Sequence, residues 1–167
     1  MSGTRYSKVA TGGTFDGLHA GQRRLLEKSF ELGGEVVIGL TSDEFAMKHG
    51  KAPRRPYVER KAELEAFIER RFPGRRYVIA QLDDFFGPGI ASKDVTALVA
   101  SPETGARVGL ANAFRAERGF PPLELVVVDW VPAEDGKPIS STRIRNGEID
   151  EEGRLMGGRV TGGSAER

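Results

Sequence analysis

Residues 12–22 read GGTFDGLHAGQ and separate a short apolar run from a helical pattern. The run KVATG, residues 8–12, is typical of a buried strand, and the apolar residues from Leu18 to Phe30 recur at the spacing of one helix face. The segment therefore predicts strand, glycine-rich loop and helix in that order. Glycines let a backbone approach an anion closely, and a helix start adds amides and the positive end of a dipole. We expect a phosphate-binding loop here.

The remainder of the chain continues the alternation of strands and helices. Further strands are predicted at residues 35–40, 77–80, 97–100 and 123–128, and helices at residues 43–48, 57–71, 101–118 and from 139. Between them, residues 83–94 are predicted to form a functional loop or a short irregular helix. The pattern predicts an α/β fold, a single-domain Rossmann-like doubly wound sheet of about five parallel strands with helices on both faces. Ligands then bind at the carboxyl ends of the strands.

Composition narrows the kinds of protein that the chain can be. Its 167 residues suit one domain, predicted at residues 1–155, and residues 156–167, which are mostly Gly, Ser and charged residues, are expected to form a disordered tail. No cysteine and only two histidines argue against disulfides and against a metal site made of protein ligands alone. A net charge of +1 does not favour nucleic acid, and no membrane segment or signal peptide is evident, so we expect a cytoplasmic protein. The sequence does not indicate an oligomeric state.

Two segments resemble the signatures of the nucleotidyltransferase superfamily, which includes cytidylyltransferases, FAD synthetases and phosphopantetheine adenylyltransferases. Residues 12–22 are similar to the pattern G-T-F-D-x-x-H-x-G-H, with Gln22 where the family has its second histidine. Residues 139–145, ISSTRIR, are similar to I-S-S-T-x-x-R. Hydroxyls at a helix start and an arginine fork both suit phosphate.

Three further stretches resemble the archaeal phosphopantetheine adenylyltransferases, and the likeness covers residues 8–153. They are GLTSDE at residues 39–44 with Lys48 after it, SPET at residues 101–104 with Asn112 and Arg115, and the pair Asp135 and Gly136. By composition alone Lys48, Asn112 and Arg115 are expected on solvated helix surfaces. The resemblance instead assigns them to the site.

The resemblance implies adenylyl transfer from ATP to 4′-phosphopantetheine, giving dephospho-CoA and pyrophosphate, with Mg²⁺ entering on ATP. It implies catalytic roles for His19 at the α-phosphate, Lys48 between the two reacting phosphates, and Arg145 at the β- and γ-phosphates. The further expected nucleotide and phosphate contacts are Gly12, Gly13, Thr14, Phe15, Asp16, Gln22, Ser101, Glu103, Asn112, Arg115, Ser140, Ser141 and Thr142.

Two alternatives remain open at this point. The enzyme could be an FAD synthetase or a cytidylyltransferase, or the chain could be a nucleotide-binding regulatory module weakened by Gln22, since an amide cannot carry positive charge. Asp16 either binds Mg²⁺ through water or ties down the loop backbone, and we favour the structural role.

Overall fold

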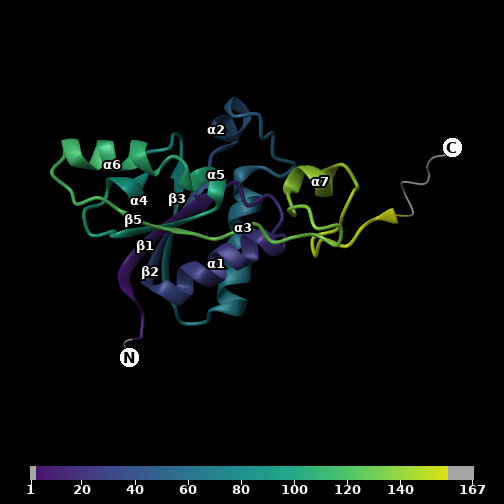
Figure 1. Cartoon of the computed structure of the whole chain (residues 1–167), viewed down its shortest axis with the longest axis horizontal. Coiled ribbons are helices and arrows are strands. Elements are labelled where there is room, and N and C mark those ends of the chain that lie inside the picture. The colour runs from purple at the N-terminus through teal and green to yellow at the C-terminus, as the bar shows by residue number, and fades with distance from the viewer. Residues whose placement is uncertain (1–2, 158–167) are drawn as a thin grey trace.

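The computed structural model describes residues 3–157, so residues 158–167 of the predicted tail lie outside the described residues. One five-stranded parallel sheet organises the chain, in the order β3-β2-β1-β4-β5 (Figure 1). The strands are β1 (Tyr6–Gly13), β2 (Gly33–Thr41), β3 (Arg76–Leu82), β4 (Ala97–Ala100) and β5 (Glu124–Val127). The chain winds outward from the central strand β1 in both directions, which creates a switch point between β1 and β4. This confirms the predicted α/β fold.

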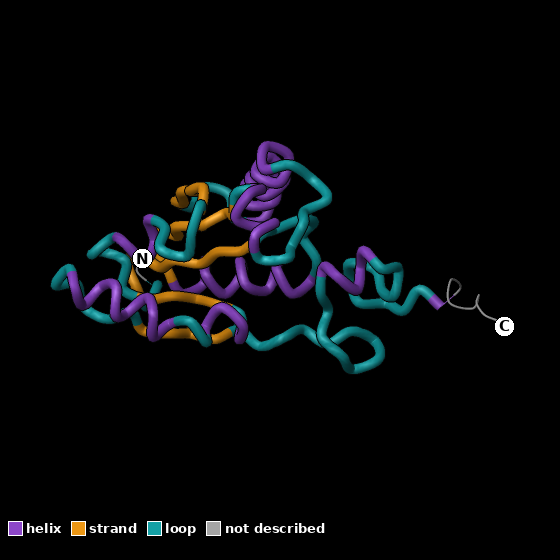
Figure 2. The backbone as a smooth tube through the Cα atoms, turned by 90° about the horizontal axis from the view of Figure 1, so that it is seen from above, coloured by secondary structure: helices purple, strands orange, loops and turns teal. Residues whose placement is uncertain are grey.

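Helices cover both faces of the sheet, as the sequence predicted (Figure 2). They are α1 (Ala20–Leu32), α2 (Asp43–Lys48), α3 (Tyr57–Arg71), α4 (Pro88–Ala91), α5 (Pro102–Gly105), α6 (Val108–Glu117) and α7 (Ser141–Arg145). One core cluster joins α1 and α3 to alternate strand residues such as Val9 and Ile38. The second cluster joins α4 and α6 to Ala10 and Val37, which are adjacent in sequence to Val9 and Ile38 and face the other side of the sheet. This division is what period-two alternation along buried strands produces.

The helix predicted over residues 101–118 is in fact two helices, α5 and α6. The chain turns at Ala106 and Arg107, and Gly105 lies against Leu125 and Val127, where an added Cβ would meet their methyl groups at 3.4–3.6 Å. Glycine is a poor helix former, so the helix pattern is weakest at this point. The predicted irregular segment at residues 83–94 contains the single-turn helix α4.

The segment after β5 leaves the sheet and folds against the start of α1, together with α7 (Figure 1). A small core of Ala133, Ile139 and Ile149 holds it together. The Ala20 amide donates to the Glu151 carbonyl at 3.0 Å, and Arg23 donates to both carboxylate oxygens of Glu152 at 2.8 Å. We call the contacts that Ala20 and Arg23 make with Glu151 and Glu152 the C-terminal clasp. It fixes the second signature segment beside the first.

Among residues 3–157, no helix combines the length and the apolar character needed to cross a membrane.

Candidate active site

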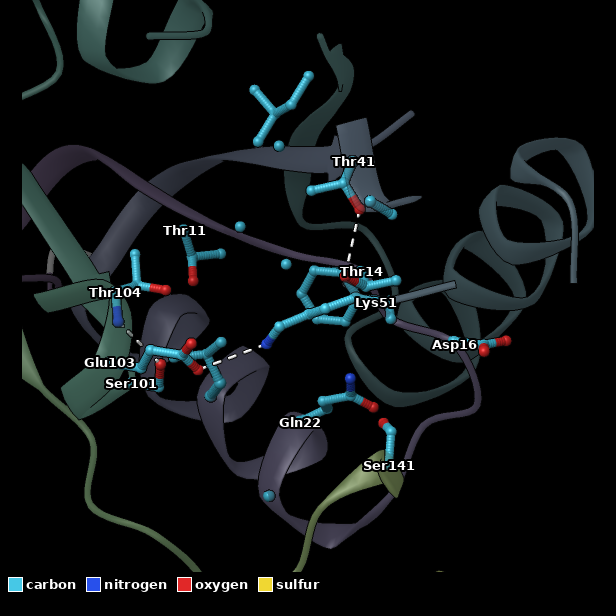
Figure 3. Close-up of a pocket in the computed structure, with 18 of the residues that line it drawn as sticks. Thr11, Thr14, Asp16, Gln22, Thr41, Lys51, Ser101, Glu103, Thr104 and Ser141 are labelled. Carbon is cyan, nitrogen blue, oxygen red and sulfur yellow. Dashed lines mark hydrogen bonds and ion pairs between the residues drawn. The ribbon is translucent and has the colours of Figure 1, made fainter. Parts of the chain in front are cut away.

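A cavity of about 450 Å³ opens at the carboxyl ends of the strands. Its walls come from the loop after β1, the start of α1, the segments after β2, β3 and β4, residues 128–131 and the start of α7 (Figure 3). Both signature segments therefore border one space, although most of the chain separates them in sequence. This is the edge at which doubly wound sheets bind ligands.

The loop after β1 is held in an unusual backbone conformation. Phe15 has a φ of 47° and Gly17 a φ of 82°, and the left-handed region costs energy for a residue other than glycine. The Phe15 ring is almost fully buried in the core that α1 covers, which anchors the loop in this shape. At Gly12 an added Cβ would lie 3.0 Å from the carbonyl oxygen of Gly39, so a side chain would push β1 away from β2. The glycines of the loop thus serve close backbone approach.

Asp16 and Arg60 tie this loop to its neighbours. One carboxylate oxygen of Asp16 accepts the Arg54 amide at 2.7 Å, which fastens the loop of residues 49–56. Arg60, fully buried, donates to the Thr14 carbonyl at 2.8 Å and to Asp43 at 2.6 Å. The Arg60 guanidinium lowers the pKa of Asp43. The Arg54 contact is what a structural role of Asp16 requires, whereas its other carboxylate oxygen is buried without a partner among the described residues, so both roles stay predictions.

His19 caps α1 and offers a donor to the cavity that it lines. Its Nδ1 accepts the amides of Gly21 and Gln22 at 3.1 and 3.3 Å. Burial, and after it the charge of Arg23, lower the pKa of His19 to about 4, so the ring is neutral at pH 7. Because Nδ1 accepts, the proton of the neutral ring is on Nε2. His19 is therefore a neutral hydrogen-bond donor, and it can act as one near neutral pH without a change of protonation state.

Gln22 completes the cap from the other direction. Its side-chain oxygen accepts the His19 amide at 3.3 Å, the reciprocal bond of a capping box. Because this bond occupies the side-chain oxygen, the side-chain nitrogen of Gln22 is left to donate to the cavity, which the residue lines. Gln22, which replaces the second histidine of the family pattern, thus preserves the helix cap and offers a neutral donor, but it supplies no cation.

The start of α7 forms the opposite wall. Ser140 caps the helix by accepting the Arg143 amide at 3.2 Å, and Ser141, Thr142 and Arg145 also line the cavity. The Arg145 guanidinium donates to the Thr142 hydroxyl at 3.3 Å. The family pattern therefore places hydroxyls and one arginine on the cavity.

Arg143 points elsewhere and holds the segment in place. It donates to Asp135 at 2.6 Å and to Glu148 at 2.9 Å, and it lowers the pKa of Asp135. This explains why the Asp135 and Gly136 turn belongs with the second signature. The turn holds Arg143, which lies two positions before Arg145 in α7.

Lys48, which we expected between the reacting phosphates, does not line the cavity. It is the last residue of α2 and is exposed. Lys51, three residues further along the chain, lines the cavity instead and extends toward Glu103 at 3.4 Å (Figure 3). Both side chains of this ion pair are more than half exposed, so the pair contributes little to stability and leaves Lys51 free to exchange partners. Sequence reasoning missed Lys51 because the end of α2 decides which lysine returns to the site.

Asn112 and Arg115 also lie outside the cavity lining, which corrects their assignment to substrate contacts. Arg115 is fully buried, and burial lowers the pKa of its guanidinium. Its guanidinium donates to the backbone carbonyls of Ile90, Ser92, Val95 and Pro121. Asn112 exchanges two hydrogen bonds with the backbone of Leu123. Both residues fasten α6 to loops of the sheet.

The remaining predicted contacts do border the cavity, and several unpredicted residues join them. The predicted ones are Gly12, Gly13, Thr14, Phe15, Asp16, His19, Gln22, Ser101, Glu103, Ser140, Ser141, Thr142 and Arg145. The unpredicted ones include Thr11, Thr41, Phe45, Lys51, Phe85 and Trp130. Trp130 is 50% exposed, and the sequence signal that could have marked it is that it is the only tryptophan of the chain. The hydroxyls of Thr41 and Thr14 lie 3.3 Å apart at the end of β2 (Figure 3).

Comparison with known proteins gives one consistent answer. A sequence model of the family described as cytidylyltransferase-like matches residues 10–147. The phosphopantetheine adenylyltransferase of Methanopyrus kandleri is 44% identical, with 88% of this chain and 93% of that one aligned. The protein of the same name from Methanosarcina acetivorans is 46% identical, with 89% and 95% aligned.

A solved structure from Archaeoglobus fulgidus, described as a protein with unknown function, has the same fold. It aligns with a TM-score of 0.67 and 30% identity, over 80% of this chain and 99% of that one.

Proposed function

The chain belongs to the cytidylyltransferase-like family, and from this premise we propose that it transfers the adenylyl group of ATP to 4′-phosphopantetheine, giving dephospho-CoA and pyrophosphate. The curated relatives that are 44–46% identical over nearly the whole chain carry the name of this activity. The observation that carries the proposal is the meeting of both signature segments on one cavity at the sheet's switch point. The reaction is a step of coenzyme A synthesis.

The cavity has two differently equipped sides. On the side of α1 and α7, amides, hydroxyls and Arg145 suit a triphosphate, and Leu25, Val128 and Trp130 suit the flat apolar base attached to it. On the side of β2 and β3 a second, largely apolar wall is formed by Phe45, Leu82, Phe85, Gly87, Gly89 and Ile90. We assign ATP to the first side and the pantetheine arm to the second, so that the two phosphates meet over Thr14 and His19.

The chemistry asks the enzyme for alignment and for neutralisation of charge. The attacking phosphate of 4′-phosphopantetheine is already an anion at neutral pH, so no strong base is needed. Its oxygen forms a bond to the α-phosphorus while the bond from that phosphorus to the bridging oxygen of pyrophosphate breaks. We propose that His19 Nε2 donates to the α-phosphoryl oxygens, that Lys51 bridges the attacking and α-phosphates, and that Arg145 neutralises the leaving pyrophosphate.

Mg²⁺ is part of this proposal as a companion of ATP. Within residues 3–157 no three His, Cys, Asp or Glu side chains gather into a metal site. The donor set therefore fits an ion held mainly by phosphate and water oxygens, which would screen the triphosphate charge. We also propose the cytoplasm as the compartment, because both substrates are charged and do not cross a bilayer unaided.

The test is a pyrophosphate-release assay with Mg²⁺ and a matrix of substrates. ATP or CTP is combined with 4′-phosphopantetheine, FMN or an alcohol phosphate. Release with ATP and 4′-phosphopantetheine alone supports the proposal, and release with FMN or with CTP identifies the other nucleotidyltransferases. Nucleotide binding without release for any acceptor identifies a regulatory module.

A further inference from the structure

Thr11 is the only polar residue among the buried residues of β1, which are Val9, Ala10 and Thr11. Alternation along the strand puts Thr11 on the same face as Val9, and its register partner on β2 is Ile38; both belong to the core that α1 covers. The Thr11 side chain is 4% exposed and lines the floor of the cavity (Figure 3). A valine would fill the same space without a polar atom.

The hydroxyl of Thr11 has no hydrogen-bond partner among the residues that the structure describes. A buried hydroxyl normally finds a partner, because its desolvation is otherwise uncompensated. Thr11 borders the cavity, so a ligand bound there can approach this residue from a side that no protein atom occupies. An unpaired polar atom at a cavity floor is the arrangement expected when a ligand supplies the partner.

The cavity-lining residues on the same side of the sheet indicate which ligand that is. Leu25 of α1 and Val128 after β5 belong to the core cluster of Val9 and Ile38, and both line the cavity. They form the wall to which we assigned the nucleoside of ATP, whereas the pantetheine arm has the wall near Phe45 and β3. The phosphates lie further out, at the amides of the loop and at α7.

We infer that the Thr11 hydroxyl is a specificity-determining contact to the nucleoside part of ATP, made at the bottom of the cavity. A hydroxyl both donates and accepts, so it suits an adenine edge or a ribose hydroxyl. The inference rests on the proposed function for the identity of the nucleotide. It adds a residue that neither signature contains.

The experiment measures binding by isothermal titration calorimetry on the full chain. The ligands are ATP, tripolyphosphate and 4′-phosphopantetheine, and the variants are Thr11→Val, Thr11→Ala and Thr11→Ser. Loss of one hydrogen bond predicts an ATP Kd raised about 3- to 10-fold in Thr11→Val and Thr11→Ala, with Thr11→Ser within about twofold of the wild type. The Kd values for tripolyphosphate and 4′-phosphopantetheine stay unchanged. The Tm of free Thr11→Val does not fall, because the lost hydroxyl had no protein partner.

Other results overturn the inference in recognisable ways. Equal ATP affinity in wild type, Thr11→Val and Thr11→Ala means that the hydroxyl contacts no nucleotide. Equal weakening of tripolyphosphate assigns it to phosphate, and weakening of 4′-phosphopantetheine alone assigns it to the acceptor side. If Thr11→Val does not fold, Thr11→Ala carries the same comparison. A wild-type chain that binds no ATP refutes the proposed function itself, which separates the two failures.

Discussion

Replacing His19 with asparagine should separate the two roles that the histidine combines. Asparagine is as good an N-cap as any residue, and its side-chain oxygen can accept the amides that Nδ1 accepts now. It cannot place a donor where Nε2 lies. We therefore expect unfolding free energy near the wild type at pH 8 and a kcat lowered about 10²- to 10³-fold, the usual effect of removing one transition-state donor.

The same variant should remove a pH dependence of stability. The pKa of His19 in the folded protein is about 4, against about 6.5 in an unfolded chain. Between these values the unfolded chain binds a proton that the folded chain does not, so wild-type stability falls as the pH drops through this window. The two pKa values give a loss of about 2 kcal/mol at pH 5 relative to pH 8. His19→Asn lacks this contribution.

Urea unfolding at pH 8 and pH 5 measures the unfolding free energy and its pH dependence, and pyrophosphate release under saturating substrates measures kcat. His49→Asn is the matched control for unfolding, since it removes the other histidine of the chain, which is exposed. The reasoning about burial fails if His19→Asn loses as much stability at pH 5 as the wild type does. The catalytic assignment fails if its kcat stays within about threefold of the wild type, far from the expected loss.

Four further outcomes follow from the site. Gln22→His should keep or raise kcat in the pyrophosphate assay, because an imidazole can carry the positive charge that an amide cannot; a marked loss would contradict this. Lys51→Met should lower kcat/KM about 10-fold or more, whereas Lys48→Met, the matched exposed control, should change it little; the reverse order would restore Lys48 to the site. Arg115→Met should lower the unfolding free energy by at least about 3 kcal/mol in urea titrations, because buried carbonyls lose a charged donor, and should leave KM unchanged at temperatures where the variant stays folded. Trp130 fluorescence should respond to ATP in the wild type, and an unchanged spectrum at saturating ATP would remove that residue from the nucleotide wall.

The fold and the two signature segments could be predicted because both depend on local pattern. Continuous apolar runs identify strands covered on both faces, and glycine, hydroxyl and histidine at a helix start identify the phosphate loop. The topology of parallel sheets then predicts that the first signature lies at the ligand-binding edge. The position of the second signature depends on the C-terminal clasp, a tertiary contact that the pattern does not contain.

Arg115 and Lys51 show where that reasoning ends. An arginine on a helix has the same pattern whether it faces a substrate or a set of backbone carbonyls, and only packing reveals that Arg115 is buried among Ile90, Ser92 and Val95. The choice between Lys48 and Lys51 depends on where α2 ends, and helix ends are the least certain part of any pattern. Both corrections arise from tertiary contacts that no local window contains.

The order in which the chain is made determines when the C-terminal clasp can form. A ribosome produces β1 and His19 well before Glu151 and Glu152, which hold the second signature against α1. A growing chain can therefore fold its sheet and still have an open, incomplete nucleotide site. Tight ATP binding should therefore require that Glu151 and Glu152 have been made, and a chain interrupted before them should bind ATP weakly.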